Sequence, residues 1–120
     1  MGPEIVVVKK GEHGAIVTYE GEVFAIPAFP TRNVMDPTGA GDSFGGGFMG
    51  YMSSVKTLTS EHIRQAIAFA SVMGSLAVEN FSINRLIGVQ SQEIHQRFEE
   101  LFKITNFDPK VTVKKIICQI

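Results

Sequence analysis

The chain of 120 residues is long enough for one domain with a hydrophobic core. Apolar residues make up 44% of it and charged residues 19%, which is typical of a soluble globular protein and not of a disordered one. The formal net charge of −1 argues against nucleic-acid binding, and no apolar run approaches membrane-spanning length. The one cysteine, Cys118, cannot form an internal disulfide, so we expect a cytoplasmic protein with no nucleic-acid or membrane partner.

The first part of the chain predicts three short strands. The β-branched run at residues 5–8 predicts a strand that is buried on both faces. Gly11 and Gly14 bracket a turn, after which residues 15–19 predict its antiparallel partner. A second turn leads to a third strand at residues 22–26.

The chain then predicts three helices, the first from about residue 42 to residue 53. Four glycines in this helix each cost about 0.5–1 kcal/mol relative to alanine, which suggests close backbone approach to a sheet or a ligand. Thr59 or Ser60 is a candidate N-cap of the second helix. A third helix is expected after Ser91, with a buried face formed by Ile94, Phe98, Leu101 and Phe102. Strands followed by helices indicate a layered α/β domain.

The last residues do not follow the helical pattern. We assign residues 1–104 to the domain and residues 105–120 to a tail, in which alternating apolar positions predict a further strand at an edge. A native segment, a fusion remnant and a partner-binding strand are all open readings of this tail.

The most informative segment is Asp36-Pro37-Thr38-Gly39-Ala40-Gly41-Asp42-Ser43-Phe44-Gly45-Gly46-Gly47. A Gly-Ala-Gly turn lets backbone amides converge on one point, and a helix that begins there adds unpaired amides and the positive end of its dipole. Such a point attracts phosphate. Asp42 is either the helix N-cap, worth about 1 kcal/mol, or a base that takes a proton from an attacking hydroxyl. The segment matches neither a P-loop nor a dinucleotide-binding fingerprint.

Residues 36–44 resemble the C-terminal signature of the ribokinase-like (PfkB-type) carbohydrate and nucleoside kinases, with Pro37 as the departure, and the resemblance extends over about residues 5–101. It implies the C-terminal, ATP-binding part of a ribokinase-like layered α/β fold. The implied reaction transfers the γ-phosphoryl group of ATP, with Mg²⁺, to a hydroxyl of a sugar, nucleoside or similar small molecule. Asp42 would be the general base, and the Gly39, Ala40 and Gly41 amides would form the anion hole.

The same resemblance assigns further residues to ATP. Lys9, Lys10, Gly11 and Gly14 match the nucleotide-side turn of the family, although a plain hairpin loop is the alternative and lysine replaces the usual hydroxyl residue at position 9. Gly41 would contact the phosphates. Ser71 lies where the family has a residue beside adenine, and it reads equally well as a small core position.

Four residues match the monovalent-cation site of the family and predict a K⁺ ion: Asp36, Thr38, Ala77 and Asn80. Asp36 reads alternatively as a side chain that caps the turn. The Gly-Ala element that usually follows the second helix is replaced here by Phe81-Ser82-Ile83-Asn84, so potassium dependence is left open.

Members of this family also carry an N-terminal half with an acceptor-recognition motif, which this sequence does not show. We therefore keep three alternatives: a fragment of a kinase, a split protein that another chain completes, and a non-catalytic nucleotide-binding or assembly module. An exposed sheet edge would also favour a homo-oligomer. The acceptor substrate cannot be inferred from this sequence.

Overall fold

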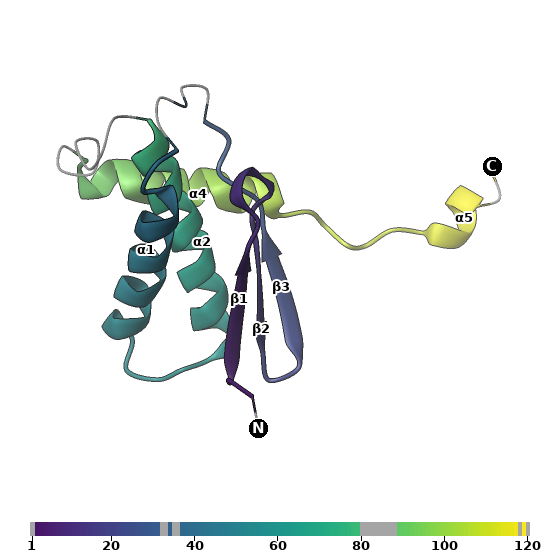
Figure 1. Cartoon of the computed structure of the whole chain (residues 1–120). Coiled ribbons are helices and arrows are strands. Elements are labelled where there is room, and N and C mark those ends of the chain that lie inside the picture. Colours follow the sequence, from purple (N-terminus) through teal and green to yellow (C-terminus); the bar gives the residue numbers. More distant parts are fainter. Residues whose placement is uncertain (1, 32–33, 35–36, 80–88, 118, 120) are drawn as a thin grey trace.

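A computed structural model describes residues 2–31, 34, 37–79, 89–117 and 119 (Figure 1). Its three strands are β1 (Ile5–Lys9), β2 (Ala15–Tyr19) and β3 (Glu22–Ile26), which form one antiparallel sheet in the order β1-β2-β3. The short 3-10 helix η1 (Gly11–His13) connects β1 to β2. The three strands and both turns predicted from the sequence are confirmed, because turn glycines and period-two patterns are local signals.

The sheet is covered on one face. Val17 lies opposite Val7 on one side and Phe24 on the other, and these side chains share the face that packs against the helices. On the opposite face Val6 and Val8 are exposed. The prediction that residues 5–8 are buried on both faces is therefore wrong. Consecutive residues of a strand point to opposite sides, and among the described residues only one side carries a packed layer.

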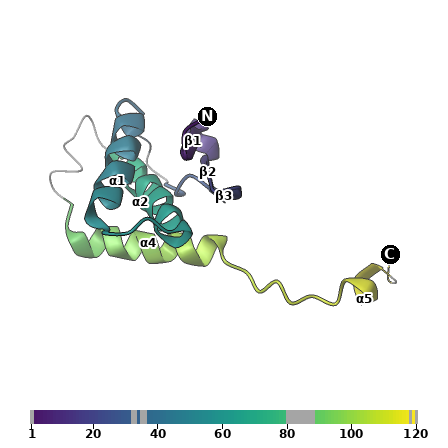
Figure 2. The ribbon, with the colours of Figure 1, turned by 90° about the horizontal axis from the view of Figure 1, so that it is seen from below.

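The central helix of the domain is α2 (Ser60–Val78), which lies between the sheet and α1 (Ala40–Ser54) in Figure 2. Thr59 is its N-cap, because its hydroxyl oxygen accepts a hydrogen bond from the His62 amide at 3.1 Å. The capping prediction is confirmed. The fully buried side chains of α2 form the centre of the core: Ile63, Ala66, Ile67, Ala70, Val72 and Leu76.

The close approach expected of the glycine-rich helix occurs at Gly47. A Cβ atom at this position would lie 3.0 Å from the Met73 Cγ and 3.2 Å from the Ala70 Cα, both on α2. At Gly45, Gly46 and Gly50 an added Cβ would meet no described atom within 4 Å. Helix packing therefore accounts for one of the four glycines.

Helix α4 (Ser91–Thr105) packs against α2 through a single face. Leu101 is buried there, and Ile94 and Phe98 pack against the core as predicted. Phe102 was expected on the same face, but 63% of it is exposed. The next residue of a helix lies about 100° further round the axis, and α2 does not cover that side.

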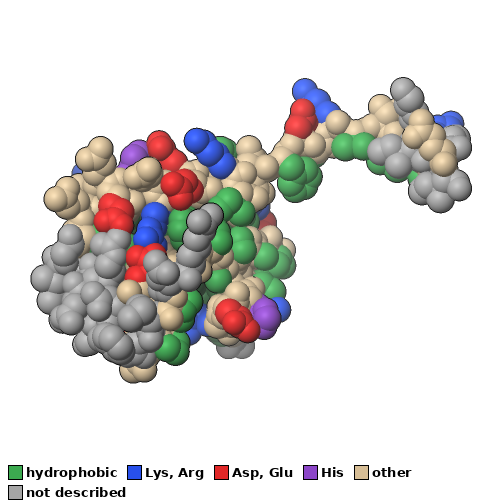
Figure 3. All heavy atoms as spheres, turned by 90° about the horizontal axis from the view of Figure 1, so that it is seen from above, with side chains coloured by type: hydrophobic (Ala, Val, Ile, Leu, Met, Phe, Trp, Pro, Cys, Tyr) green, Lys and Arg blue, Asp and Glu red, His purple; other side chains and the backbone are tan. Residues whose placement is uncertain are grey.

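The C-terminal segment contains the short helix α5 (Val113–Ile117), so the predicted edge strand is wrong. Figures 1 and 2 show residues 106–117 running away from the body, without lying beside β1 or β3. A strand needs a partner for its backbone groups, whereas a helical turn makes its hydrogen bonds locally. Figure 3 shows hydrophobic side chains along this segment, where Phe107, Val111 and Val113 are exposed.

Candidate functional site

A cleft of about 700 Å³ lies where four parts of the chain meet: the end of β1 with η1, the first turn of α1, the C-terminal half of α2, and the segment after β3. Six of the residues assigned to ATP or to the anion turn line this cleft: Lys9, Gly11, Gly14, Ala40, Gly41 and Ser71. Three others, Lys10, Gly39 and Asp42, are not among its lining residues. The structure therefore brings together most of the residues that the sequence assigned to one site.

The motif turn leads directly into α1. Gly39 is the N-cap residue, with a φ of 85° that favours glycine, and its carbonyl accepts the Ser43 amide at 2.9 Å. The Ala40 amide donates to the Pro37 carbonyl at 3.2 Å, so this predicted anion-hole donor is engaged within the turn. The amides of Gly41 and Asp42 lie in the first helical turn, where helix geometry supplies no backbone acceptor. The assignment of these backbone amides to an anion hole stays a prediction.

Asp42 is the third residue of α1 and is exposed. The reading of Asp42 as N-cap is wrong, because Gly39 occupies that position. A carboxylate in the first turn still interacts favourably with the helix dipole. Within the described part of the chain no hydrogen bond or ion pair engages this carboxylate.

Lys9 extends from the end of β1 over the first turn of α1. Its Nζ donates to the Gly41 carbonyl at 3.3 Å, which places an ammonium beside the motif turn. Lys10 has a different role, since its amide closes the η1 loop on the Gly14 carbonyl at 2.7 Å. Gly14 itself has a φ of 88°, and an added Cβ would lie 2.1 Å from the Ile26 carbonyl oxygen. Only glycine fits at this position.

Ser71 is buried on α2, as the reading of a small core position requires, and it also lines the cleft. Its contact with adenine stays a prediction. Its hydroxyl donates to the Pro27 carbonyl at 2.8 Å. This bond fixes the segment after β3 against α2.

The comparisons with known proteins agree with this geometry. A sequence profile of the pfkB family carbohydrate kinases matches residues 1–86. The chain belongs to the pfkB family. It is 40% identical over 80 residues to a nucleoside kinase of Methanothermobacter thermautotrophicus, an alignment that covers 67% of this chain and 24% of that protein.

Solved structures of pfkB family kinases share the fold. Aminoimidazole riboside kinase from Salmonella enterica, complexed with aminoimidazole riboside and an ATP analogue, superposes with a TM-score of 0.71 at 26% identity, covering 81% of this chain and 32% of that one. The nucleoside kinase of Burkholderia thailandensis in complex with ADP-inosine gives a TM-score of 0.70 at 28% identity, covering 91% of this chain and 32% of that one. The ribokinase-like α/β prediction is confirmed. The chain spans about a quarter of the length of the curated relatives it matches.

Two of the four residues assigned to K⁺, Asp36 and Asn80, lie outside the described residues of this pfkB family chain. Thr38 is exposed just before Gly39, and Ala77 is buried in α2. Across the residues that the structure describes, no group of three or more His, Cys, Asp or Glu side chains could hold a metal ion. The cation site remains a prediction. No helix of the described part is long and apolar enough to cross a membrane.

Sequence analysis missed one charged group behind the cleft of this pfkB family chain. Arg97 on α4 forms an ion pair with Glu79 at the C-terminal end of α2, with 2.5 Å between Nη2 and Oε1. A signal for it exists in the sequence, because Arg97 lies three residues after Ile94 and four before Leu101 and therefore falls within a buried stripe. A charge in such a stripe requires a partner.

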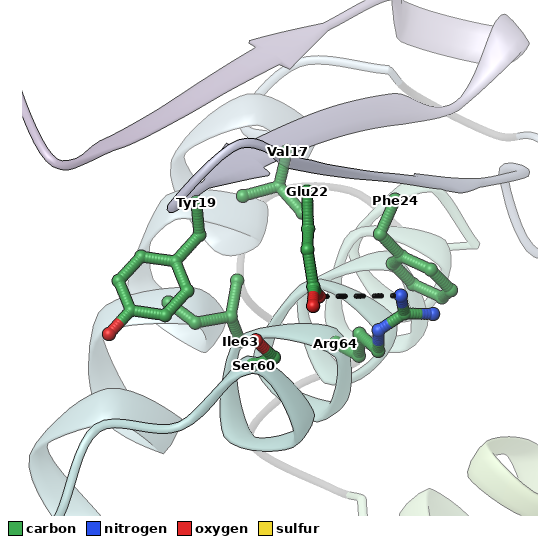
Figure 4. A pocket seen from close by; sticks show the side chains of 7 residues that line it. All are labelled: Val17, Tyr19, Glu22, Phe24, Ser60, Ile63 and Arg64. Carbon is green, nitrogen blue, oxygen red and sulfur yellow. Dashed lines mark ion pairs between the residues drawn. The ribbon is translucent and has the colours of Figure 1, made fainter.

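A second hollow, between β2, β3 and the start of α2, differs from the cleft. Figure 4 shows the Arg64 guanidinium reaching toward Glu22 and Phe24, 3.7 Å from the Glu22 carboxylate and 4.8 Å from the Phe24 ring centroid. The hollow has a volume of about 10 Å³, room for about one water molecule. It is not a ligand site.

Proposed function

We propose that this chain forms the nucleotide-binding part of a kinase domain that transfers the γ-phosphoryl group of ATP to a hydroxyl of a sugar, nucleoside or related small molecule. The observation that carries the proposal is the meeting of Lys9, Gly41 and Ser71 in one cleft of about 700 Å³ beside the motif turn. That volume lies within the usual range for small-molecule sites. Membership of the pfkB family supports the same reaction class.

In this proposal Asp42 is the general base. The acceptor oxygen forms a bond to the γ-phosphorus while the bond from this phosphorus to the β–γ bridging oxygen breaks, and ADP leaves. The hydroxyl proton passes to the Asp42 carboxylate. The first-turn amides of Gly41 and Asp42, together with the Lys9 ammonium, would stabilise the negative charge on the transferring oxygens. Positioning and charge stabilisation supply most of the acceleration in phosphoryl transfer, and proton transfer supplies a smaller share.

Magnesium accompanies ATP in reactions of this class, where it bridges the phosphate oxygens. The described residues do not include a carboxylate cluster that fits such an ion. We therefore assign no described residue to magnesium.

The alternative is a nucleotide-binding or assembly module that has no turnover of its own, or that gains turnover when another chain supplies the acceptor site. One observation favours it. Asp42 is not among the residues that line the cleft.

The test measures ADP release when the chain is mixed with ATP, Mg²⁺ and each member of a panel of sugars and nucleosides. We expect release with at least one acceptor, and a fall in kcat of about 10²- to 10⁴-fold in Asp42→Asn at an ATP Kd within about twofold of the unaltered chain. Glu61→Gln is the matched control. Glu61 is also an exposed carboxylate in the first turn of a helix, but this helix is α2 and not α1. Retained turnover in Asp42→Asn would remove the base assignment. ATP binding without ADP release for every acceptor would favour the module, and absence of ATP binding would overturn the proposal.

A further inference from the structure

Arg97 joins three parts of the domain that are far apart in the sequence. Its Nη2 pairs with Glu79 at 2.5 Å, and its Nη1 donates to the Ser75 hydroxyl at 3.0 Å. The Arg97 and Glu79 side chains are 15% and 17% exposed, so both charges are largely removed from water. Glu93, one turn earlier on α4, lies 3.8 Å from the same guanidinium.

The same ion pair also holds one wall of the cleft. We call residues 29–31 the cleft wall, since Phe29, Pro30 and Thr31 all line the cleft. The Thr31 hydroxyl donates to the Glu79 Oε1 at 3.1 Å, and the Arg97 guanidinium carbon lies 5.2 Å from the centroid of the Phe29 ring. Arg97 and Glu79 do not themselves line the cleft, so they act on its shape from behind.

An ion pair this far from water is a poor source of stability. Its desolvation cost is large, and two apolar side chains of similar volume often stabilise a fold equally well or better. What the pair supplies here is a fixed geometry, because one carboxylate oxygen accepts from both Arg97 and Thr31. We propose that Arg97 and Glu79 are positioning residues that hold the cleft wall in the shape that receives the nucleotide. The inference rests on the proposed function, and it concerns affinity for the nucleotide rather than the chemical step.

The chain offers a matched control in Arg64. It too pairs with a glutamate and lies over a phenylalanine ring, 3.7 Å from the Glu22 carboxylate and 4.8 Å from the Phe24 centroid. None of these three residues lines the cleft. Figure 4 shows this second arginine with its own partners on β3. Removing it deletes contacts of the same kind from a different part of the domain.

The experiment compares Arg97→Met with Arg64→Met in the full chain, well below the melting temperature of each. The two readouts are the Kd for ATP by calorimetry and the rate at which pancreatic elastase cleaves after Ala28, with the cleavage site identified by mass spectrometry. We expect Arg97→Met to raise the Kd and the cleavage rate at least about fivefold, and Arg64→Met to change each less than about twofold. Thr31→Val removes only the wall's hydrogen bond to Glu79 and should shift both readouts in the same direction, by about twofold to threefold.

A double variant separates positioning from simple stabilisation. Arg97→Met combined with Glu79→Leu replaces the ion pair by apolar side chains, so its melting temperature should recover relative to Arg97→Met alone. Its ATP affinity should stay weak, because Thr31 has lost its acceptor. Recovery of affinity together with stability would overturn the inference, as would an Arg97→Met or Thr31→Val variant with the Kd and cleavage rate of the unaltered chain. The unaltered chain could fail to bind ATP while Arg97→Met is still cleaved faster than Arg64→Met. That result would overturn the proposed function and support the contact between Arg97 and the cleft wall.

Discussion

Replacement of Lys9 by methionine tests whether the cleft binds the phosphates of ATP. The Lys9 ammonium lies 3.3 Å from the Gly41 carbonyl, in the first turn of α1, and both residues line the cleft. Methionine keeps most of the length of the side chain and removes its charge. Lys10→Met makes the same chemical change one residue further on, where the side chain is exposed and does not line the cleft.

The expected size of the effect follows from the exposure of Lys9. A hydrogen bond between a charged donor and a phosphate contributes about 1.5–3 kcal/mol, and an exposed side chain takes the lower end of that range. A loss of about 1.5 kcal/mol raises the Kd for ATP about tenfold. Lys10→Met should change the Kd by less than about twofold, because its side chain is exposed and does not line the cleft.

Calorimetric titrations with ATP and with adenosine would measure these values at low and at high salt. The Lys9→Met effect should be confined to ATP, since adenosine has no phosphate, and it should shrink as salt screens the exposed charge. Equal effects of Lys9→Met and Lys10→Met on ATP would refute the contact and indicate a general response to net charge. An equal loss of affinity for adenosine would show that the substitution disturbs the cleft itself.

Three further substitutions test packing around the cleft by urea denaturation followed by circular dichroism. Gly50→Ala should raise the free energy of unfolding by about 0.5–1 kcal/mol, because no described atom lies within 4 Å of its added Cβ. Gly47→Ala should lower that free energy, because its Cβ would lie 3.0 Å from the Met73 Cγ and overpacking costs about 1–3 kcal/mol; equal gains for both glycines would refute close approach of α1 and α2. Ser71→Ala should cost about 1–2 kcal/mol by leaving the Pro27 carbonyl without its donor, and an unchanged urea midpoint would contradict this.

The sequence predicts the local features of this domain well. Strands β2 and β3 lie where alternation and turn glycines place them, and Thr59 caps α2 as its side chain favours. Helix α1 begins at Ala40, two residues earlier than apolar spacing suggests, because Gly39 adopts a left-handed conformation and caps it without a side chain. Each of these features is set by residues within about one turn of each other.

The predictions that are wrong concern which other parts of the chain pack against a segment. Val8 on β1 and Phe102 on α4 were expected in the core, and both are exposed because no described layer covers their sides. The C-terminal segment alternates like a strand, yet residues 113–117 are helical because no sheet edge lies beside them. Arg97 is the opposite case. A charged residue at a position that helical spacing places on the buried face must have a partner, but the sequence does not say which, and only the fold identifies Glu79.

For the candidate site, the sequence indicates which residue types belong to it. It does not predict how these residues are arranged in space. Ala40 and Gly41 of the Gly-Ala-Gly turn line the cleft, but the engagement of the Ala40 amide by Pro37 depends on the conformation of the turn. The sequence also assigned Lys9 and Lys10 together. Only the structure separates a side chain beside Gly41 from one whose backbone closes a loop.

Two glycines outside the motif turn account for how the cleft is assembled. Gly14 lets the η1 loop contact the segment after β3, where any Cβ would lie 2.1 Å from the Ile26 carbonyl oxygen, and Gly47 lets α1 approach α2. The first contact fixes the end of β1, which carries Lys9, and the second fixes the helix that carries Gly41. Because both ends are held by backbone packing, the Lys9 ammonium meets the Gly41 carbonyl at 3.3 Å. The Lys9 ammonium, which binds phosphate in the proposed function, is therefore oriented by two glycines that do not take part in the chemistry.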